Sequence, residues 1–106
     1  MEKNTKKYYA LKVLARYSQG ASARQIVEEN EKELQGYGFN TRGKNGDIIT
    51  NSFNATLACM CKSVNNDNEE NIFIVKKAKS AMYKENAYTL YTINKNGLAQ
   101  IEEENN

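Results

Sequence analysis

Two short stretches late in the chain have the residue pattern of β-strands. Residues 72–75 form an apolar run that suits a buried strand, and aromatic and β-branched side chains alternate between two faces along residues 87–93. The polar, basic residues 76–86 between them predict a hairpin tip. Because a lone hairpin is only marginally stable in water, these strands have to pack on helices formed by the rest of the chain.

Two helical segments are predicted at the start of the chain, where apolar residues recur at helical spacing. The first covers residues 6–19, and Gly20 closes it as a C-terminal glycine commonly does. The second opens at Ser22, which has the Ser-x-x-Gln spacing of a capping box, and runs to about residue 34. Asn30 lies on its apolar stripe, where we expect a hydrogen bond to nearby backbone.

A third helix is predicted over residues 50–64, after a loop at residues 35–50 that contains four glycines. Thr50 or Asn51 can cap it, and its face opposite the core is small and polar. Its expected buried stripe consists of Phe53, Leu57, Met60, Cys61 and Val64. A last short helix follows the strands, with Asn94 as its cap and Ile101 near its end.

The 106 residues therefore predict one α+β, mostly α, domain over residues 6–101, with flexible ends at residues 1–5 and at the acidic residues 102–106. There is no run of 18 apolar residues, and the lysine-rich start has no apolar segment behind it. These features predict a cytoplasmic protein without membrane contact. In that compartment we expect Cys59 and Cys61 to be reduced thiols.

The residue types leave little for catalysis or metal binding. The chain has no histidine, which excludes Ser-His and Cys-His pairs, and two cysteines are too few for a zinc site. Residues 38–45 nearly match a phosphate-binding P-loop, but Asn45 replaces the required Ser or Thr and no strand precedes the loop. We therefore expect neither an enzyme nor a cofactor.

Positive charge is concentrated locally although the net charge is only +2. Residues 76–84 contain four lysines and no acid. A basic hairpin tip has two interpretations: it binds nucleic acid, or its lysines guard the strands against edge pairing with other chains. The small polar face of the third helix favours the nucleic-acid interpretation.

The closing segment, residues 88–102, resembles the wing strand and the Y-x-L-T-x-x-G entry into a final helix of many bacterial winged-helix regulators. It departs from them by one residue, because Tyr91 lies between Leu90 and Thr92. Residues 22–27 and 50–57 are similar to the HARE-HTH type of winged helix, which is associated with restriction systems and chromatin-linked proteins. The usual proline at the start of the third helix is missing, since the chain has no proline. The resemblance covers roughly residues 6–102.

This resemblance to winged helix-turn-helix domains implies a three-helix core, a two-stranded wing and binding of double-stranded DNA. The third helix would enter a major groove, where Asn51 and Asn54 would read adenine edges. Ser52 and Thr56 would contact bases or phosphates, Ala55 would allow close approach, and Lys62 would meet the backbone. The wing would contact phosphates or enter a minor groove, and the glycine-rich loop could also touch a phosphate; the residues concerned are Lys76, Lys77, Lys79, Tyr83 and Lys84 of the wing and Arg42 and Lys44 of the loop.

The sequence is also compatible with a winged helix that binds protein. Such a domain could be a subunit of a larger complex, or a small phage-type inhibitor that occupies another protein's nucleic-acid site. The modest net charge and the acidic second helix leave this alternative open. A homodimer through the first and last helices is compatible too, because winged-helix proteins often read paired half-sites.

Overall fold

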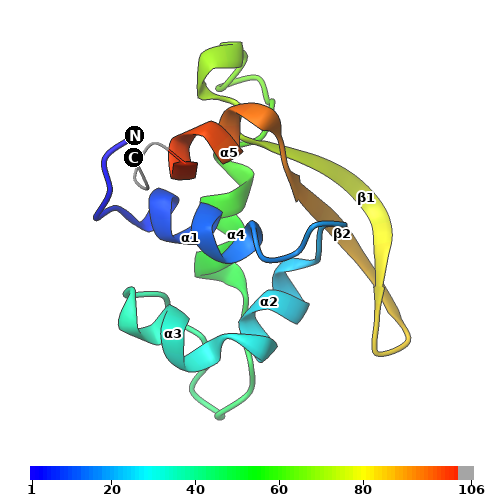
Figure 1. Ribbon diagram of the computed structural model, residues 1–106. Coiled ribbons are helices and arrows are strands. Elements are labelled where there is room, and N and C mark those ends of the chain that lie inside the picture. Colours follow the sequence, from blue (N-terminus) through cyan, green and yellow to red (C-terminus); the bar gives the residue numbers. More distant parts are fainter. Residues whose placement is uncertain (103–106) are drawn as a thin grey trace.

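The computed structural model describes residues 1–102 and contains five α-helices and one antiparallel hairpin (Figure 1). This arrangement confirms the α+β class. Only Glu102 of the predicted acidic end lies within the described residues. The elements in chain order are α1 (Lys6–Leu14), α2 (Ala23–Glu29), α3 (Glu31–Gly36), α4 (Asn51–Ala58), the 3-10 helix η1 (Glu69–Asn71), β1 (Ile74–Tyr83), β2 (Asn86–Ile93) and α5 (Lys95–Glu102).

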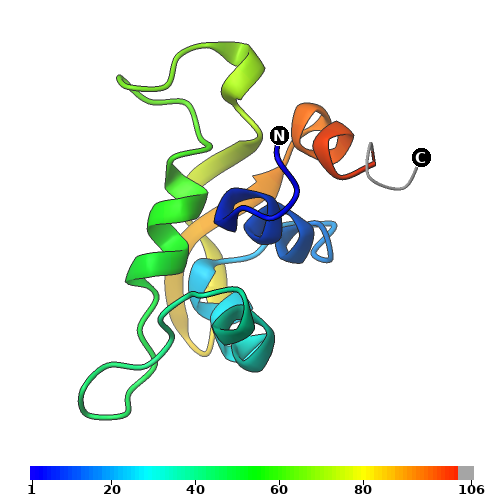
Figure 2. The same ribbon diagram turned by 90° about the vertical axis from the view of Figure 1, so that its left-hand side faces the viewer.

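The hairpin extends along one side of the helices, and α4 with the loop before it forms another edge of the molecule (Figures 1 and 2). One continuous core joins the helices to the hairpin. Its fully buried members include Leu11, Leu14, Ile26, Phe53, Leu57 and Ile74. Among residues 1–102, no helix has the length and apolar character needed to cross a membrane.

The first helix is shorter than predicted. Thr5 caps it by accepting a hydrogen bond from the Tyr8 N–H, but it ends at Leu14 instead of residue 19. The chain then turns so that Ala21 can form a two-way backbone bridge with Tyr91 of β2 (3.0 and 2.9 Å). Gly20 adopts φ +81° in this turn, so it serves the approach to β2 and does not close the helix.

The predicted second helix is two helices, separated at Asn30. The Asn30 backbone leaves the helical region (φ −129°, ψ 29°), and its side-chain amide donates to the Ile26 carbonyl and the Tyr17 hydroxyl, both at 2.9 Å. The backbone bond expected for Asn30 is confirmed. Half of the capping box is confirmed as well, since the Ser22 hydroxyl accepts from the Gln25 N–H, whereas the Gln25 side chain turns to Glu29.

The third predicted helix, α4, ends at Ala58, six residues before the expected end at residue 64. Phe53, Leu57, Met60 and Cys61 are buried as predicted, but Val64 is 97% exposed. Just after the helix, the Met60 carbonyl accepts from the N–H groups of Phe73 and Ile74, which joins this segment to the start of β1.

The hairpin tip is much smaller than predicted. Residues 76–83 belong to β1, and the turn consists of Lys84 and Glu85, both with positive φ (48° and 69°). The register shifts between Lys77 and Ala81, where Lys79 also has a positive φ of 49°. The basic residues thus form a bulged strand and not a loop, because pairing with β2 extends across them.

The start of α5 agrees with the prediction. The Asn94 side chain accepts a hydrogen bond from the Gly97 N–H at 2.8 Å, which caps the helix. Gly97 is buried, and a Cβ there would lie 2.5 Å from the Phe73 carbonyl oxygen. The absence of a side chain at Gly97 therefore lets α5 pack directly against the start of the hairpin.

We expect Gly20→Ala to lower the free energy of unfolding by more than about 2 kcal/mol, because the left-handed backbone and a steric clash add together. A Cβ at Gly20 would lie 2.5 Å from the Thr92 hydroxyl oxygen and 2.7 Å from the Tyr91 carbonyl oxygen. Gly36→Ala is the matched control, since nothing lies within 4 Å of a Cβ there. Urea denaturation of both variants measures the difference, and equal midpoints would contradict the close approach.

Candidate nucleic-acid interface

The solvent face of α4 carries short side chains. Asn51 and Ala55 are exposed, and Ser52 and Thr56 are half-buried. The Thr56 hydroxyl donates to the Ser52 carbonyl at 3.1 Å, so it is already engaged with the helix backbone. The first turn contains no acidic residue that would repel phosphate. This face allows close approach of another molecule, and Asn51 is its most accessible polar group.

Asn54 does not share this free position. Its side-chain oxygen accepts a 2.7 Å hydrogen bond from the hydroxyl of Tyr91, which is itself buried in the core. A two-point contact with adenine needs both the oxygen and the nitrogen of an asparagine amide. Asn54 therefore connects α4 to β2, and Asn51 is the better-placed of the two predicted base-reading residues.

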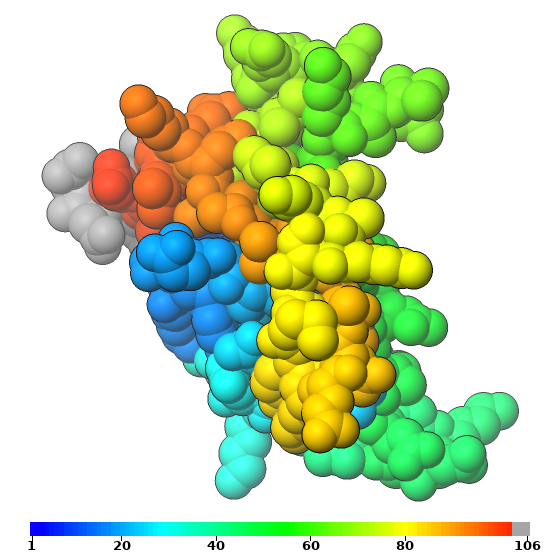
Figure 3. All heavy atoms as spheres, turned by 90° about the vertical axis from the view of Figure 1, so that its right-hand side faces the viewer, coloured from blue at the N-terminus to red at the C-terminus, as the bar shows by residue number. Residues whose placement is uncertain are grey.

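Three predicted lysines, Lys76, Lys77 and Lys79, lie exposed on β1. Figure 3 shows the side chains of β1 beside those of α4 and of the loop before it. Within residues 1–102, no ion pair involves these lysines or Lys62, which follows α4. The structure thus brings four uncompensated ammonium groups to the strand and helix that border this face.

Lys84 behaves differently, because its ammonium group lies 2.9 Å from the Glu28 carboxylate of α2. Glu28 raises the pKa of Lys84, and Lys84 in turn lowers the pKa of Glu28. The ammonium group also lies 5.3 Å from the centre of the half-buried Tyr83 ring. The ion pair therefore connects the tip of the hairpin to α2, and the Lys84 ammonium group already has a counter-ion.

Arg42 is also paired. Its guanidinium group makes two short contacts with the Glu31 carboxylate, at 2.7 and 2.9 Å, and donates to the Gly46 carbonyl at 2.7 Å. Glu31 raises the pKa of Arg42, and Arg42 lowers that of Glu31. These bonds order the loop before α4. Lys44 stays exposed at the tip of that loop, so it is the loop cation with the best access to a phosphate.

The P-loop resemblance lacks its structural context. Helix α3 precedes the loop, and the only sheet among the described residues is an antiparallel hairpin. A P-loop needs a strand before it and a helix directly after its lysine. In the described part of the chain, no group of three or more Cys, Asp or Glu residues is arranged to hold a metal ion.

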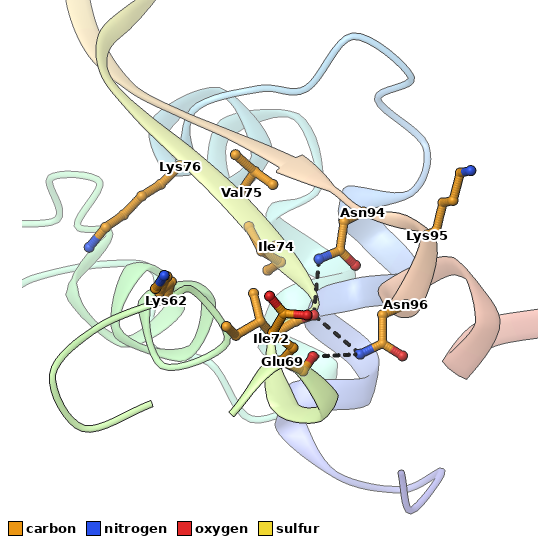
Figure 4. Close-up of a pocket in the computed structure, with 9 residues that line it drawn as sticks. All are labelled: Lys62, Glu69, Ile72, Ile74, Val75, Lys76, Asn94, Lys95 and Asn96. Atoms are coloured by element: carbon orange, nitrogen blue, oxygen red, sulfur yellow. Dashed lines mark hydrogen bonds between the residues drawn. The ribbon is translucent and has the colours of Figure 1, made fainter. Parts of the chain in front are cut away.

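The sequence reasoning missed the two acids that hold predicted phosphate-binding cations, Glu28 and Glu31. Glu28 is 56 residues away from Lys84, so no local spacing connects them. It also missed Lys95, which lies with Lys62 and Lys76 around a hollow beside β1 (Figure 4). None of these contacts has a short-range sequence signal, because Glu28 and Lys95 meet their neighbours only where the hairpin packs on the helices, and Glu31 meets Arg42 only when the loop before α4 folds back on α3.

No protein-family model matches the sequence, and neither a curated protein nor a solved structure matches the chain.

The two thiols are expected to react at very different rates. Cys59 is exposed at the end of α4, whereas Cys61 is 1% exposed and burial raises its pKa to about 11. Because the thiolate is the reactive form, a disulfide reagent at pH 8 should modify one thiol quickly in the native protein. Cys59→Ser should remove the fast reaction, and Cys61→Ser should retain it. Equal rates for the two thiols would contradict the buried position of Cys61.

Proposed function

We propose that the protein is a winged-helix DNA-binding protein, with α4 as the recognition helix and the β1–β2 hairpin as the wing. The observation that carries the proposal is the set of lysines on β1 and after α4 that have no ion-pair partner among residues 1–102, next to a small polar helix face. Lysines supply sequence-independent phosphate contacts, and short side chains on the helix allow it to approach the bases.

The attachment of the hairpin supports the same proposal. The Ala21–Tyr91 bridge and the Tyr91–Asn54 hydrogen bond hold β2 against the helices, so α4 and the wing keep a constant relative position. A wing has to be held in this way to contact the backbone beside the groove that its helix occupies. Within α4, Asn51 would read adenine, and the absence of arginine there limits guanine recognition.

The β1 lysines give the first test. Changing Lys76, Lys77 and Lys79 together to alanine should weaken binding to a mixed-sequence duplex by about tenfold or more at low salt and reduce the salt slope by about 3. Fluorescence anisotropy at several salt concentrations measures both quantities. The matched control changes Lys3, Lys7 and Lys32 to alanine, which removes the same charge from exposed positions outside the hairpin and α4. If both triple variants behave alike, net charge and not the wing determines binding.

Glu28 gives a second test, because it competes with phosphate for Lys84. Glu28→Gln should strengthen duplex binding by about two- to fivefold and increase the salt slope by about 1. Glu29→Gln, on the same helix, changes the net charge equally but leaves the Lys84 contact in place. An equal gain in duplex affinity for both variants would argue against release of Lys84. The same conclusion would follow if the gain from Glu28→Gln persisted in the double variant that also carries Lys84→Ala.

A further inference from the structure

The outer edge of β1 has hydrogen-bonding groups without a strand to pair with. The sheet has two strands, and both backbone groups of Tyr91 bond to Ala21 on the side away from β1. Lys76 is the register partner of Tyr91, so Lys76 and Tyr91 form a pair that is not hydrogen-bonded. The N–H and C=O of Lys76 therefore point outward, from the open edge of the strand.

Only the start of this edge is covered. The Ile74 N–H, which also points outward, donates to the Met60 carbonyl at 3.2 Å. Beyond Ile74, no other described segment pairs with the outer edge. The regular part of the strand continues to Lys77, where the bulge interrupts the register. The open edge therefore has only a short stretch of regular strand. It begins just after Ile74, where the contact with Met60 ends, and it stops at Lys77.

A hollow of ≈ 730 Å³ lies at this point, and its chemistry is mixed (Figure 4). Ile72, Ile74 and Val75 form its apolar part, and Val75 is 58% exposed. Around it lie three lysines and one glutamate: Lys62, Lys76, Lys95 and Glu69. The Asn94 and Asn96 amides donate to the Ile72 carbonyl at 2.9 and 3.3 Å, so they stabilise the wall of the hollow.

We propose that this edge and hollow bind an extended, acidic and aliphatic peptide segment of a partner protein, which adds to β1 as a further strand. The open backbone groups of β1 would supply main-chain hydrogen bonds. Alternate side chains of an added strand point to opposite faces, so aliphatic residues can cover Val75 while acidic residues meet Lys76 and Lys62. This inference goes beyond DNA binding and does not depend on it.

A second copy of the chain is a poor occupant of the same edge. Antiparallel pairing of two β1 strands would bring the lysines at positions 76, 77 and 79 of both copies together. Like charges on neighbouring strands are destabilising, and lysines commonly protect edges from self-association. The same lysines attract a strand of opposite charge, so the charge pattern selects an acidic partner.

Peptide and duplex would compete, because Lys62 and Lys76 border both surfaces. This consequence, unlike peptide binding itself, depends on the proposed DNA binding. A partner protein with such a segment would therefore control access to the lysines of the wing.

Fluorescence anisotropy with the full chain tests the proposal. The probe is a fluorescein-labelled eight-residue peptide of alternating Glu and Val, compared with alternating Lys and Val and with eight Glu residues. We expect the Glu-Val peptide to bind at least about tenfold more tightly than the all-Glu peptide, and the Lys-Val peptide not to bind. Equal binding of the Glu-Val and all-Glu peptides would overturn the proposal and indicate a general polyanion surface, and so would no binding at low salt.

Two pairs of variants separate the edge from simple charge. Lys76→Pro and Lys76→Ala both remove the ammonium group, but only proline removes the outward N–H, and the ladder to β2 does not use that N–H. Lys76→Pro should therefore weaken Glu-Val binding about fivefold or more relative to Lys76→Ala, with circular dichroism confirming that both fold. Equal affinities would exclude strand addition.

The second pair does not depend on how proline is tolerated. Val75→Asp places a negative charge in the hollow, whereas Met82→Asp changes another exposed apolar position, beyond the bulge. Val75→Asp should abolish Glu-Val binding, and Met82→Asp should retain it; an unchanged Val75→Asp variant would refute the site. Asn51→Ala separates the two proposals, because it should weaken duplex binding and leave peptide binding unchanged.

Discussion

The architecture depends on how Tyr91 attaches the hairpin to the helices. A two-stranded hairpin is marginal by itself, so it needs a fixed partner. Tyr91 is 3% exposed, exchanges both backbone hydrogen bonds with Ala21, and donates its hydroxyl hydrogen to Asn54 of α4. One residue of β2 thus joins the strand to the segment before α2 and to α4. The positions of both candidate surfaces follow from this attachment, because each is built from β1 and the end or face of α4.

Charge pairing then decides which cations are accessible. The acids of α2 and α3 hold Lys84 and Arg42, and Glu33 holds Arg16 so closely that the pKa of Glu33 falls to about 2. These ion pairs compensate the positive charges of Lys84, Arg42 and Arg16. The lysines of β1 have no acidic partner in the described part of the chain, so a protein with a net charge of only +2 still has a distinctly basic strand. Local pairing, and not net charge, sets its electrostatic character.

The hairpin also has a strained backbone. Lys79, Lys84 and Glu85 have positive φ values, which cost roughly 1 kcal/mol or more each in residues other than glycine. Lys84 also contacts Glu28, and at Lys79 the bulge ends the regular pairing of the strand. The bulge therefore limits the open edge to a short segment beside the hollow. The two proposed surfaces therefore overlap on β1 at Lys76, and only the proposed phosphate surface extends past the bulge to Lys79.

The sequence alone determined that helices come before a hairpin and a last helix, the caps at Ser22 and Asn94, and most of the buried residues in and after α4, because periodicity and capping are local. It did not show that the second helix breaks at Asn30. It could not determine where α1 and α4 end, since the segments after them form hydrogen bonds with Tyr91 of β2 and with Phe73 and Ile74, which are distant in sequence. The sequence did not predict that most of the basic segment belongs to strand β1, because a lysine-rich segment becomes a strand only when β2 pairs with it. The sequence identified a basic segment, but only the tertiary structure decided that Lys84 has an acidic partner while Lys76 and Lys77 have none among the described residues. That difference is set by carboxylates distant in sequence, which folding brings to one cation and not to the others.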